Sequence, residues 1–223
     1  MNVDITLPDG SVRNYESPVT GYQIAESIGP RLLKDAICVE IDNKFQDLSY
    51  EISESTNIRI VTTKDLDALH ILRHSSAHIL AQAVLNLYPN AQFGVGPSIE
   101  NGFYYDFLFE TPIKENELEN IEKEMKRIAK SAQSFIRSEI TKKDAVKIFR
   151  NQKLKLELIE SAESDEGVGE EIVSTYANDG FIDLCMGPHV PSTSVLKYFK
   201  LTKVSGAYWR GDESNVQLQR IYG

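Results

Sequence analysis

The chain has 223 residues, 41% of them hydrophobic, and its 33 acidic residues outnumber its 24 basic residues to leave a net charge of −9. This composition supports one large or two small cores, and the negative charge argues against a protein that coats nucleic acid non-specifically. No apolar run approaches the roughly 18 residues that span a bilayer, and residues 1–8 lack the basic and apolar regions of a signal peptide. Two cysteines exclude a disulfide framework. We therefore expect a cytoplasmic protein with no membrane partner.

Residues 1–62 predict one small α+β domain. Two runs of alternating polarity flank Pro8-Asp9-Gly10-Ser11, which is typical of a β-hairpin. The segment 20–28 predicts a helix, because its first residue is a threonine that can act as N-cap, Gln23 stands at capping-box spacing and Gly29-Pro30 ends it. Further strands are expected at 36–41, 44–48 and 57–61. Together these elements predict a domain of ubiquitin-like size.

Residues 63–223 predict a second α+β domain, built on a long helix and a mostly antiparallel sheet. The long helix is expected at 65–87, where apolar residues recur at helical spacing. A charged amphipathic helix follows, and a hairpin is expected around Asn178-Asp179-Gly180. In chain order the other expected elements are strands 92–95 and 102–109, helix 114–132, strand 136–140, helix 142–150, the hairpin strands 170–176 and 181–184, and strands 200–204, 207–210 and 216–222.

The chain has only four histidines, and three of them, His70, His74 and His78, stand four residues apart in the long helix. Side chains four residues apart differ by only about 40° in direction around the helix axis, so all three histidines share one side of that helix. The fourth, His189, follows Cys185 by four residues. Pro188 excludes a regular helix between these two and indicates a rigid turn. A lone histidine or cysteine is usually a packing residue, but two such pairs together favour a functional site.

Two chemistries fit this set of one thiol and three imidazoles. Cysteine and histidine ligands can hold zinc tetrahedrally, either in a closed structural site or with one position left for a water. Alternatively, an imidazole activates water without a metal while neighbouring groups hold the substrate and stabilise the oxyanion. The spacing alone does not choose between them.

The segments Arg73–His78 and Cys185–His189 resemble the H-x-x-x-H and C-x-x-x-H signature of threonyl- and alanyl-tRNA synthetase editing domains. Further stretches resemble the threonyl-tRNA synthetase family in particular, and residues 5–11 look like the ubiquitin-like TGS domain that precedes editing in it. These stretches are Gly96–Asp106, Gly187–Pro191, Gly206–Asp212 and Gln219–Gly223.

The resemblance implies a set of site residues by position. Four residues, two histidines of the long helix and the Cys185/His189 pair, match the signature itself. Two other residues match positions that line the family's pocket. One lysine matches a catalytic lysine that the family has downstream of the central helices. His70 lies outside the signature and is expected to be a spectator. The implied catalytic residues are His74, His78, Lys155, Cys185 and His189, and the implied substrate-binding residues are Tyr105 and Asp183. The family implies a metal-free site, so no cofactor is expected, although zinc at His74, His78, Cys185 and His189 stays possible.

The resemblance also implies a function. The chain is expected to proofread, by hydrolysing serine from mischarged tRNA(Thr) while rejecting threonyl-tRNA(Thr). Its partners would be the serine-carrying 3′ end of tRNA(Thr) and the rest of a synthetase chain, since no aminoacylation motif is present, and a homodimer is expected only for the full-length enzyme. Two alternatives remain at this point, a zinc-dependent hydrolase of another substrate and a non-catalytic module that binds RNA or protein.

Overall fold

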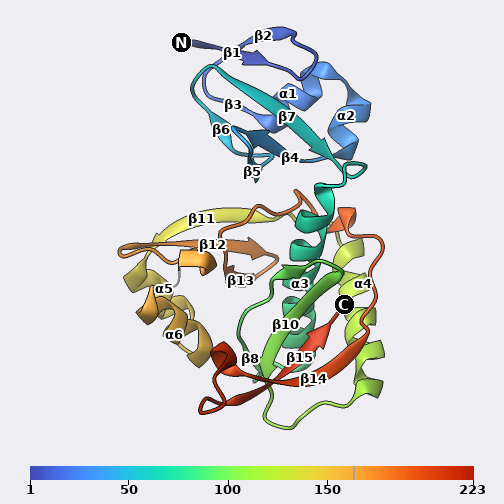
Figure 1. Ribbon diagram of the computed structural model, residues 1–223, viewed down its shortest axis with the longest axis vertical. Coiled ribbons are helices and arrows are strands. Elements are labelled where there is room, and N and C mark those ends of the chain that lie inside the picture. Colours follow the sequence, from blue (N-terminus) through green and yellow to red (C-terminus); the bar gives the residue numbers. More distant parts are fainter. Residues whose placement is uncertain (163) are drawn as a thin grey trace. The chain divides into compact units, whose positions relative to one another are not determined.

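The computed structural model describes residues 1–162 and 164–223, and these residues form two compact units. Unit 1 comprises Met1–Leu72 and the short segment Gly187–Pro191, and unit 2 comprises Arg73–Met186 and Ser192–Gly223. The sequence-based division after residue 62 stays a prediction. Both units mix helices with sheets that are almost entirely antiparallel, so the fold class is α+β (Figure 1).

Unit 1 is a five-stranded sheet in the order β2-β1-β7-β4-β5, in which only β1 and β7 run parallel. A separate two-stranded pair, β3 with β6, completes it. The predicted hairpin is confirmed as β1 and β2, and the other predicted strands appear as β4, β5 and β7. The bounds are β1 (Asn2–Thr6), β2 (Val12–Glu16), β3 (Val19–Thr20), β4 (Ala36–Ile41), β5 (Lys44–Asp47), β6 (Glu51–Ile52) and β7 (Thr56–Thr62).

Helix α1 (Gly21–Ile28) packs against the sheet of unit 1 through Ile24, which is fully buried. The predicted capping box is confirmed, because the Thr20 side chain accepts from the amide of Gln23 while Gln23 Oε1 accepts from the amide of Thr20. The predicted end of the helix at Gly29-Pro30 is confirmed, but a second helix, α2 (Pro30–Asp35), begins directly after it. Proline at the first position of a helix is favourable, since its missing N–H would have no partner there.

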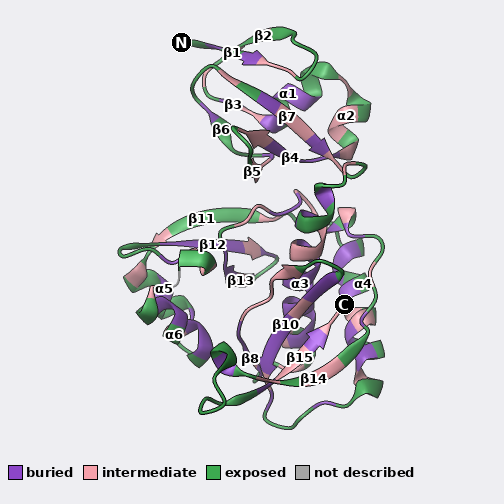
Figure 2. Cartoon of the chain, viewed as in Figure 1, coloured by how far each residue is buried: buried purple, intermediate pink, exposed green. Residues whose placement is uncertain are grey.

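Unit 2 is built around α3 (Ala68–Leu87), whose first five residues belong to unit 1. Most of α3 from Ser75 to Val84 is buried, as is most of the neighbouring strand β10, whereas β11 lies on the outside (Figure 2). The helices that follow are α4 (Leu118–Lys130), α5 (Lys142–Ile148) and α6 (Lys153–Ser161), with 3₁₀ turns at η1 (Glu115–Glu117), η2 (Ser164–Glu166), η3 (Thr193–Val195) and η4 (Trp209–Gly211).

The described residues of unit 2 form two antiparallel sheets. One has the order β14-β15-β10-β8, with β9 also paired to β10, and the other has the order β11-β12-β13. The predicted hairpin around Asn178-Asp179-Gly180 is confirmed as β12 and β13. The bounds are β8 (Gln92–Phe93), β9 (Ser98–Ile99), β10 (Gly102–Leu108), β11 (Ile136–Thr141), β12 (Ile172–Asn178), β13 (Phe181–Leu184), β14 (Lys203–Tyr208) and β15 (Gln217–Tyr222).

Two sequence-based expectations for unit 2 were wrong. The expected strands 200–204 and 207–210 are one strand, β14, because Gly206 continues the pairing with β15 and the chain turns only at Trp209–Gly211. Helix α6 was not expected at all, because the lysine at position 155 interrupts the apolar pattern of a helix that buries Leu154 and Leu158. The structure shows that this lysine is buried as well.

Candidate functional site

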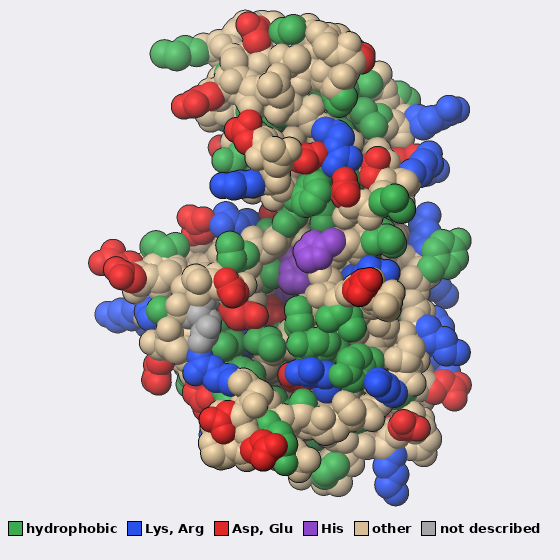
Figure 3. Space-filling view, viewed as in Figure 1, with side chains coloured by type: hydrophobic (Ala, Val, Ile, Leu, Met, Phe, Trp, Pro, Cys, Tyr) green, Lys and Arg blue, Asp and Glu red, His purple; other side chains and the backbone are tan. Residues whose placement is uncertain are grey.

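The three histidines of α3 differ in exposure along the helix. His70 is exposed, His74 is half-buried and His78 is only 3% exposed. Figure 3 shows histidine side chains that reach the surface at the level of α3. His74 Nε2 lies 3.0 Å from Cys185 Sγ, which is a hydrogen-bonding distance for sulfur. One histidine of the H-x-x-x-H motif and the cysteine of the C-x-x-x-H motif therefore meet at this contact.

The β12–β13 hairpin positions Cys185 and Asp183. Tyr176 pairs with Asp183, and the amide of Cys185 donates to the carbonyl of Ser174, so the ladder continues one residue beyond β13. Residues two apart on a strand point to the same face. Asp183 and Cys185 therefore share one face of the hairpin, and Cys185 stands directly after the strand end, as expected from the sequence.

Lys155, Asp183 and Tyr105 form one buried cluster. Lys155 Nζ lies 2.5 Å from Asp183 Oδ1, and the Tyr105 hydroxyl donates to Asp183 Oδ2 at 2.5 Å. Lys155 Nζ is also 3.2 Å from the Tyr105 hydroxyl and 4.9 Å from the centre of the Phe93 ring. The side chain of Lys155 is 0% exposed and that of Asp183 is 5% exposed. Burying either of these two charges without the other would cost several kcal/mol of folding free energy, so the ammonium and the carboxylate stabilise each other.

The electrostatics of this cluster keep Tyr105 protonated. Burial raises the pKa of Tyr105 well above its ordinary value, and the neighbouring Asp183 carboxylate raises it further. Burial likewise raises the pKa of Glu166, with the Lys155 ammonium lowering it and Asp183 adding to the rise. Glu166 is thus an additional acidic group within the electrostatic reach of the cluster, and sequence reasoning did not single it out.

His78 occupies an aromatic environment. Its ring makes edge contacts with Phe135, at 5.2 Å between ring centres, and with Phe181, at 4.8 Å. Burial lowers the pKa of His78 to about 4, while the charge of Asp183 acts in the opposite direction. The imidazole is therefore neutral near pH 7.

His189 belongs to the segment Gly187–Pro191, and its backbone amide donates to Asp47 Oδ1 at 3.0 Å. The side chain is 1% exposed. Within unit 2, the imidazole of His74 and the thiol of Cys185 are donors of the kind that zinc accepts.

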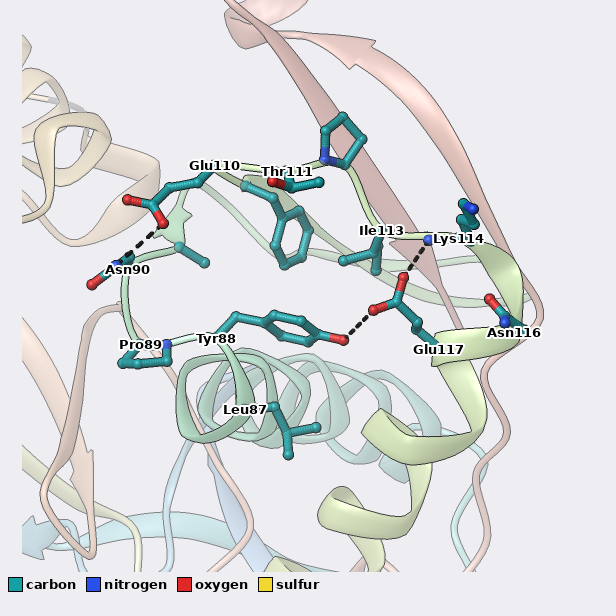
Figure 4. Close-up of a pocket in the computed structure, with 13 residues that line it drawn as sticks. Leu87, Tyr88, Pro89, Asn90, Glu110, Thr111, Ile113, Lys114, Asn116 and Glu117 are labelled. Carbon is teal, nitrogen blue, oxygen red and sulfur yellow. Dashed lines mark hydrogen bonds between the residues drawn. The ribbon is translucent and has the colours of Figure 1, made fainter.

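A surface hollow lies elsewhere in unit 2. It has a volume of about 540 Å³, and Tyr88 and Glu117 meet on one side of it through a hydrogen bond of 2.8 Å (Figure 4). None of the seven predicted site residues lines it. The lining residues are Leu87, Tyr88, Pro89, Asn90, Ala91, Phe109, Glu110, Thr111, Pro112, Ile113, Lys114, Asn116 and Glu117.

Comparison with known families assigns both parts of the chain. Residues 3–62 match the model of the TGS domain, and residues 173–222 match the model described as "Threonyl and Alanyl tRNA synthetase second additional domain". Residues 3–62 are thus similar to a TGS domain, and residues 173–222 are similar to this second additional domain. The β-grasp fold of the TGS domain agrees with the ubiquitin-like fold expected from the sequence. The additional domain includes β12 to β15, and with them Asp183, Cys185 and His189.

The chain is similar to threonine–tRNA ligases over 99% of its length. It is 52% identical over 224 residues to the protein of that name from Burkholderia multivorans and 51% identical over 223 residues to that from Paraburkholderia phytofirmans. In each case the match covers 99% of this chain and 34% of the relative, so the chain spans about a third of the length of the relatives it matches. Among the helices of residues 1–162 and 164–223, none has the length and apolar character required to cross a bilayer.

Proposed function

We propose that this chain is the proofreading module of a threonine–tRNA ligase, which hydrolyses the ester of seryl-tRNA(Thr) and rejects threonyl-tRNA(Thr). The observation that carries the proposal is the buried cluster of Lys155, Asp183 and Tyr105 on the same hairpin face as Cys185, which contacts His74. Its partners are then the 3′ end of tRNA(Thr) and the remainder of the ligase. Similarity to editing domains supports the assignment of tRNA as the substrate class.

The buried ion pair suggests how the substrate is recognised. The aminoacyl ester carries an ammonium group, which is a cation of the same charge as Lys155. In the proposed mechanism this ammonium binds Asp183 and takes over one carboxylate oxygen from Lys155. Lys155 Nζ then turns to the ester carbonyl and stabilises the negative charge that develops on its oxygen. Tyr105 keeps its hydrogen bond to Asp183 and holds the carboxylate in place.

His74 is the group best placed to orient water, because it is only half-buried and its Nε2 reaches Cys185 Sγ. A water oxygen adds to the ester carbonyl, the bond from carbonyl carbon to ribose oxygen breaks, and the water proton ends on the ribose hydroxyl. The products are free serine and tRNA. Cys185 and His189 bound the side-chain pocket in this proposal, so that the additional methyl of threonine clashes with them.

Size exclusion is the reason that a second site is needed. A synthetic pocket distinguishes side chains that differ by one methyl group by only about 1–3 kcal/mol, so serine is accepted too often. A hydrolytic site that is too small for threonine removes this error, because it admits serine alone. The selectivity therefore depends on the shape of the pocket, which the groups at Cys185 and His189 set in the proposed arrangement.

The editing reaction is proposed to need no metal. His74 and Cys185 already form a hydrogen bond with each other, and Lys155 supplies a positive charge of the kind that a metal would otherwise provide. A zinc-dependent hydrolase is the second candidate, favoured by the contact of the His74 imidazole with the Cys185 thiol, because both are ligands that zinc accepts. Stoichiometric zinc that is required for hydrolysis would favour that candidate over metal-free editing.

The test is deacylation of seryl-tRNA(Thr) and threonyl-tRNA(Thr) by the purified chain, in buffer treated with a chelator. We expect hydrolysis of the seryl ester only. His74→Ala should abolish this activity, whereas His70→Ala, which changes an exposed histidine one turn away on the same helix, should leave it unchanged. Equal hydrolysis of both esters, or full activity of His74→Ala, would refute the proposal.

A further inference from the structure

The ladder between β12 and β13 ends at Ser174, which continues the register of the hairpin opposite Cys185. In a hydrogen-bonded pair of an antiparallel sheet, the two residues exchange both of their backbone hydrogen bonds. The amide of Cys185 donates to the carbonyl of Ser174 at 3.1 Å, which is the first of these bonds. The amide of Ser174 donates instead to the carbonyl of Gly167, at 2.7 Å. Ser174 is therefore shared between two segments, and the chain of β13 leaves the ladder at Cys185.

The second of these segments, residues 167–169, pairs with the start of β12. Val168 forms a bridge with Val173, and the amide of Gly169 donates to the carbonyl of Ile172 at 2.9 Å. Residues 167–169 therefore continue along β12 from the point where β13 stops. The two segments meet end to end at positions 167 and 185, so the thiol of the candidate site stands at their junction.

The junction leaves no room for a side chain at position 167. A Cβ atom there would lie 2.9 Å from the carbonyl carbon of Cys185, 3.0 Å from its oxygen and 3.1 Å from the amide nitrogen of Met186. All three are backbone atoms, and carbon atoms in favourable contact stay about 3.5–4.0 Å apart. Gly167 also has a φ of 77°, in the left-handed region that glycine adopts readily. A side chain at position 167 would therefore displace the peptide between Cys185 and Met186.

We propose that Gly167 is a positioning residue for the Cys185 thiol and, through this thiol, a determinant of substrate selectivity. The contact that depends on this position joins Cys185 Sγ to His74 Nε2 at 3.0 Å. The role in selectivity rests on the proposed editing function, in which Cys185 bounds the pocket for the serine side chain. A thiol displaced into the pocket hinders serine, and a thiol displaced outward admits threonine. Either displacement lowers the preference for the seryl ester.

The first test compares deacylation by the wild type, Gly167→Ala and Gly211→Ala. Gly211 is the matched control, because its φ of 72° is also left-handed but a Cβ atom there meets nothing within 4 Å. In Gly167→Ala, the ratio of kcat/KM for seryl-tRNA(Thr) to that for threonyl-tRNA(Thr) should fall by about tenfold or more. In Gly211→Ala, it should stay within about twofold of the wild-type ratio. A merely destabilised fold lowers both rates together and leaves the ratio unchanged.

The second test does not depend on the editing function. It uses side-chain NMR of ¹⁵N-labelled histidine in the full chain at pH 7, where the ring signals of His74 report its contact with the thiol. Cys185→Ala shows the shift of these signals when the thiol is removed. Gly167→Ala should move the His74 signals toward those of Cys185→Ala, whereas the signals of the exposed His70 should stay in place. Gly211→Ala should leave both sets of signals where they are in the wild type.

The outcomes separate the two proposals. An unchanged ester ratio in Gly167→Ala, or an equal fall in Gly211→Ala, would overturn the role in selectivity. Wild-type His74 signals in Gly167→Ala would overturn the positioning role. Loss of cooperative urea unfolding in Gly167→Ala would overturn it as well, because a positioning role leaves the sheets of unit 2 intact. A wild-type chain that hydrolyses neither ester refutes the proposed editing function, and the NMR measurement still decides whether Gly167 positions the thiol.

Discussion

At the scale of single residues, the buried charge of Lys155 is expected to have a large effect on stability. Lys155→Met leaves the Asp183 carboxylate buried without its cation, and breaking a buried pair in this way costs roughly 3–5 kcal/mol. The free energy of unfolding, measured in urea through the fluorescence of Trp209, should fall accordingly. The double variant Lys155→Met with Asp183→Asn removes both charges and should recover at least half of the loss. A double variant no more stable than the single one would contradict this account.

His78 should make stability depend on pH. Its pKa in the folded protein is about 4, below the ordinary value of 6.5, so the unfolded chain binds the proton more readily. Stability from this group is fully present above pH 6.5 and is lost as pH falls toward 4. Between pH 7 and pH 5 the loss is about 2 kcal/mol. In His78→Gln, the free energy of unfolding measured in urea should decline less steeply between pH 7 and pH 5. An equal decline in both proteins would contradict this prediction.

The sequence identified some site residues better than others. His74, His78 and Cys185 are rare residue types in spaced motifs, so their selection needed no structure. Lys155 was identified by resemblance alone, and its burial against Asp183 appears only when α6 and β13 are brought together.

At the scale of elements, the turn of the β12–β13 hairpin controls the placement of Asp183 and Cys185. Asp179 and Gly180 have φ values of 45° and 86°, as a two-residue turn with left-handed positions requires. An added Cβ at Gly180 meets nothing within 4 Å, so only the backbone conformation resists a side chain there. Gly180→Val should therefore cost about 1–2 kcal/mol and lower seryl-tRNA hydrolysis.

Gly180→Asn is the matched variant, because asparagine tolerates the left-handed region. Thermal unfolding of both proteins, followed through Trp209, compares them directly. We expect Asn to be close to the wild type and Val to be clearly less stable. If both lose the same stability, the turn conformation is not what matters.

Two elements with local signals were predicted correctly, and two elements that depend on distant contacts were not. The capping box of α1 and the Asn-Asp-Gly turn are encoded within a few residues, so the sequence was enough. Helix α6 was missed because its inward lysine looks like a surface residue until Asp183 is present on the other side. The course of β14 through Gly206 likewise depends on its pairing with Gln219 in β15.

At the scale of the whole molecule, the negative net charge of the chain is unfavourable for binding the proposed substrate, which is itself negatively charged. In the proposed function, a polyanionic tRNA binds a chain with a net charge of −9. Non-specific binding to nucleic acid depends on neutralised phosphates, and each one contributes about 0.9 to the slope of log affinity against log salt. A chain that recognises chiefly the aminoacyl ester should neutralise few phosphates, and most of the affinity for tRNA then belongs to other parts of the ligase.

This argument predicts a weak salt dependence for the isolated chain. The logarithm of kcat/KM for seryl-tRNA(Thr), plotted against the logarithm of salt concentration, should have a slope no steeper than about −2. Urea unfolding at each salt concentration serves as the control, because it separates effects on binding from effects on the fold. A slope of about −5 or steeper would reveal a basic face that the net charge hides, and recognition would then extend from the ester to the backbone of the acceptor stem.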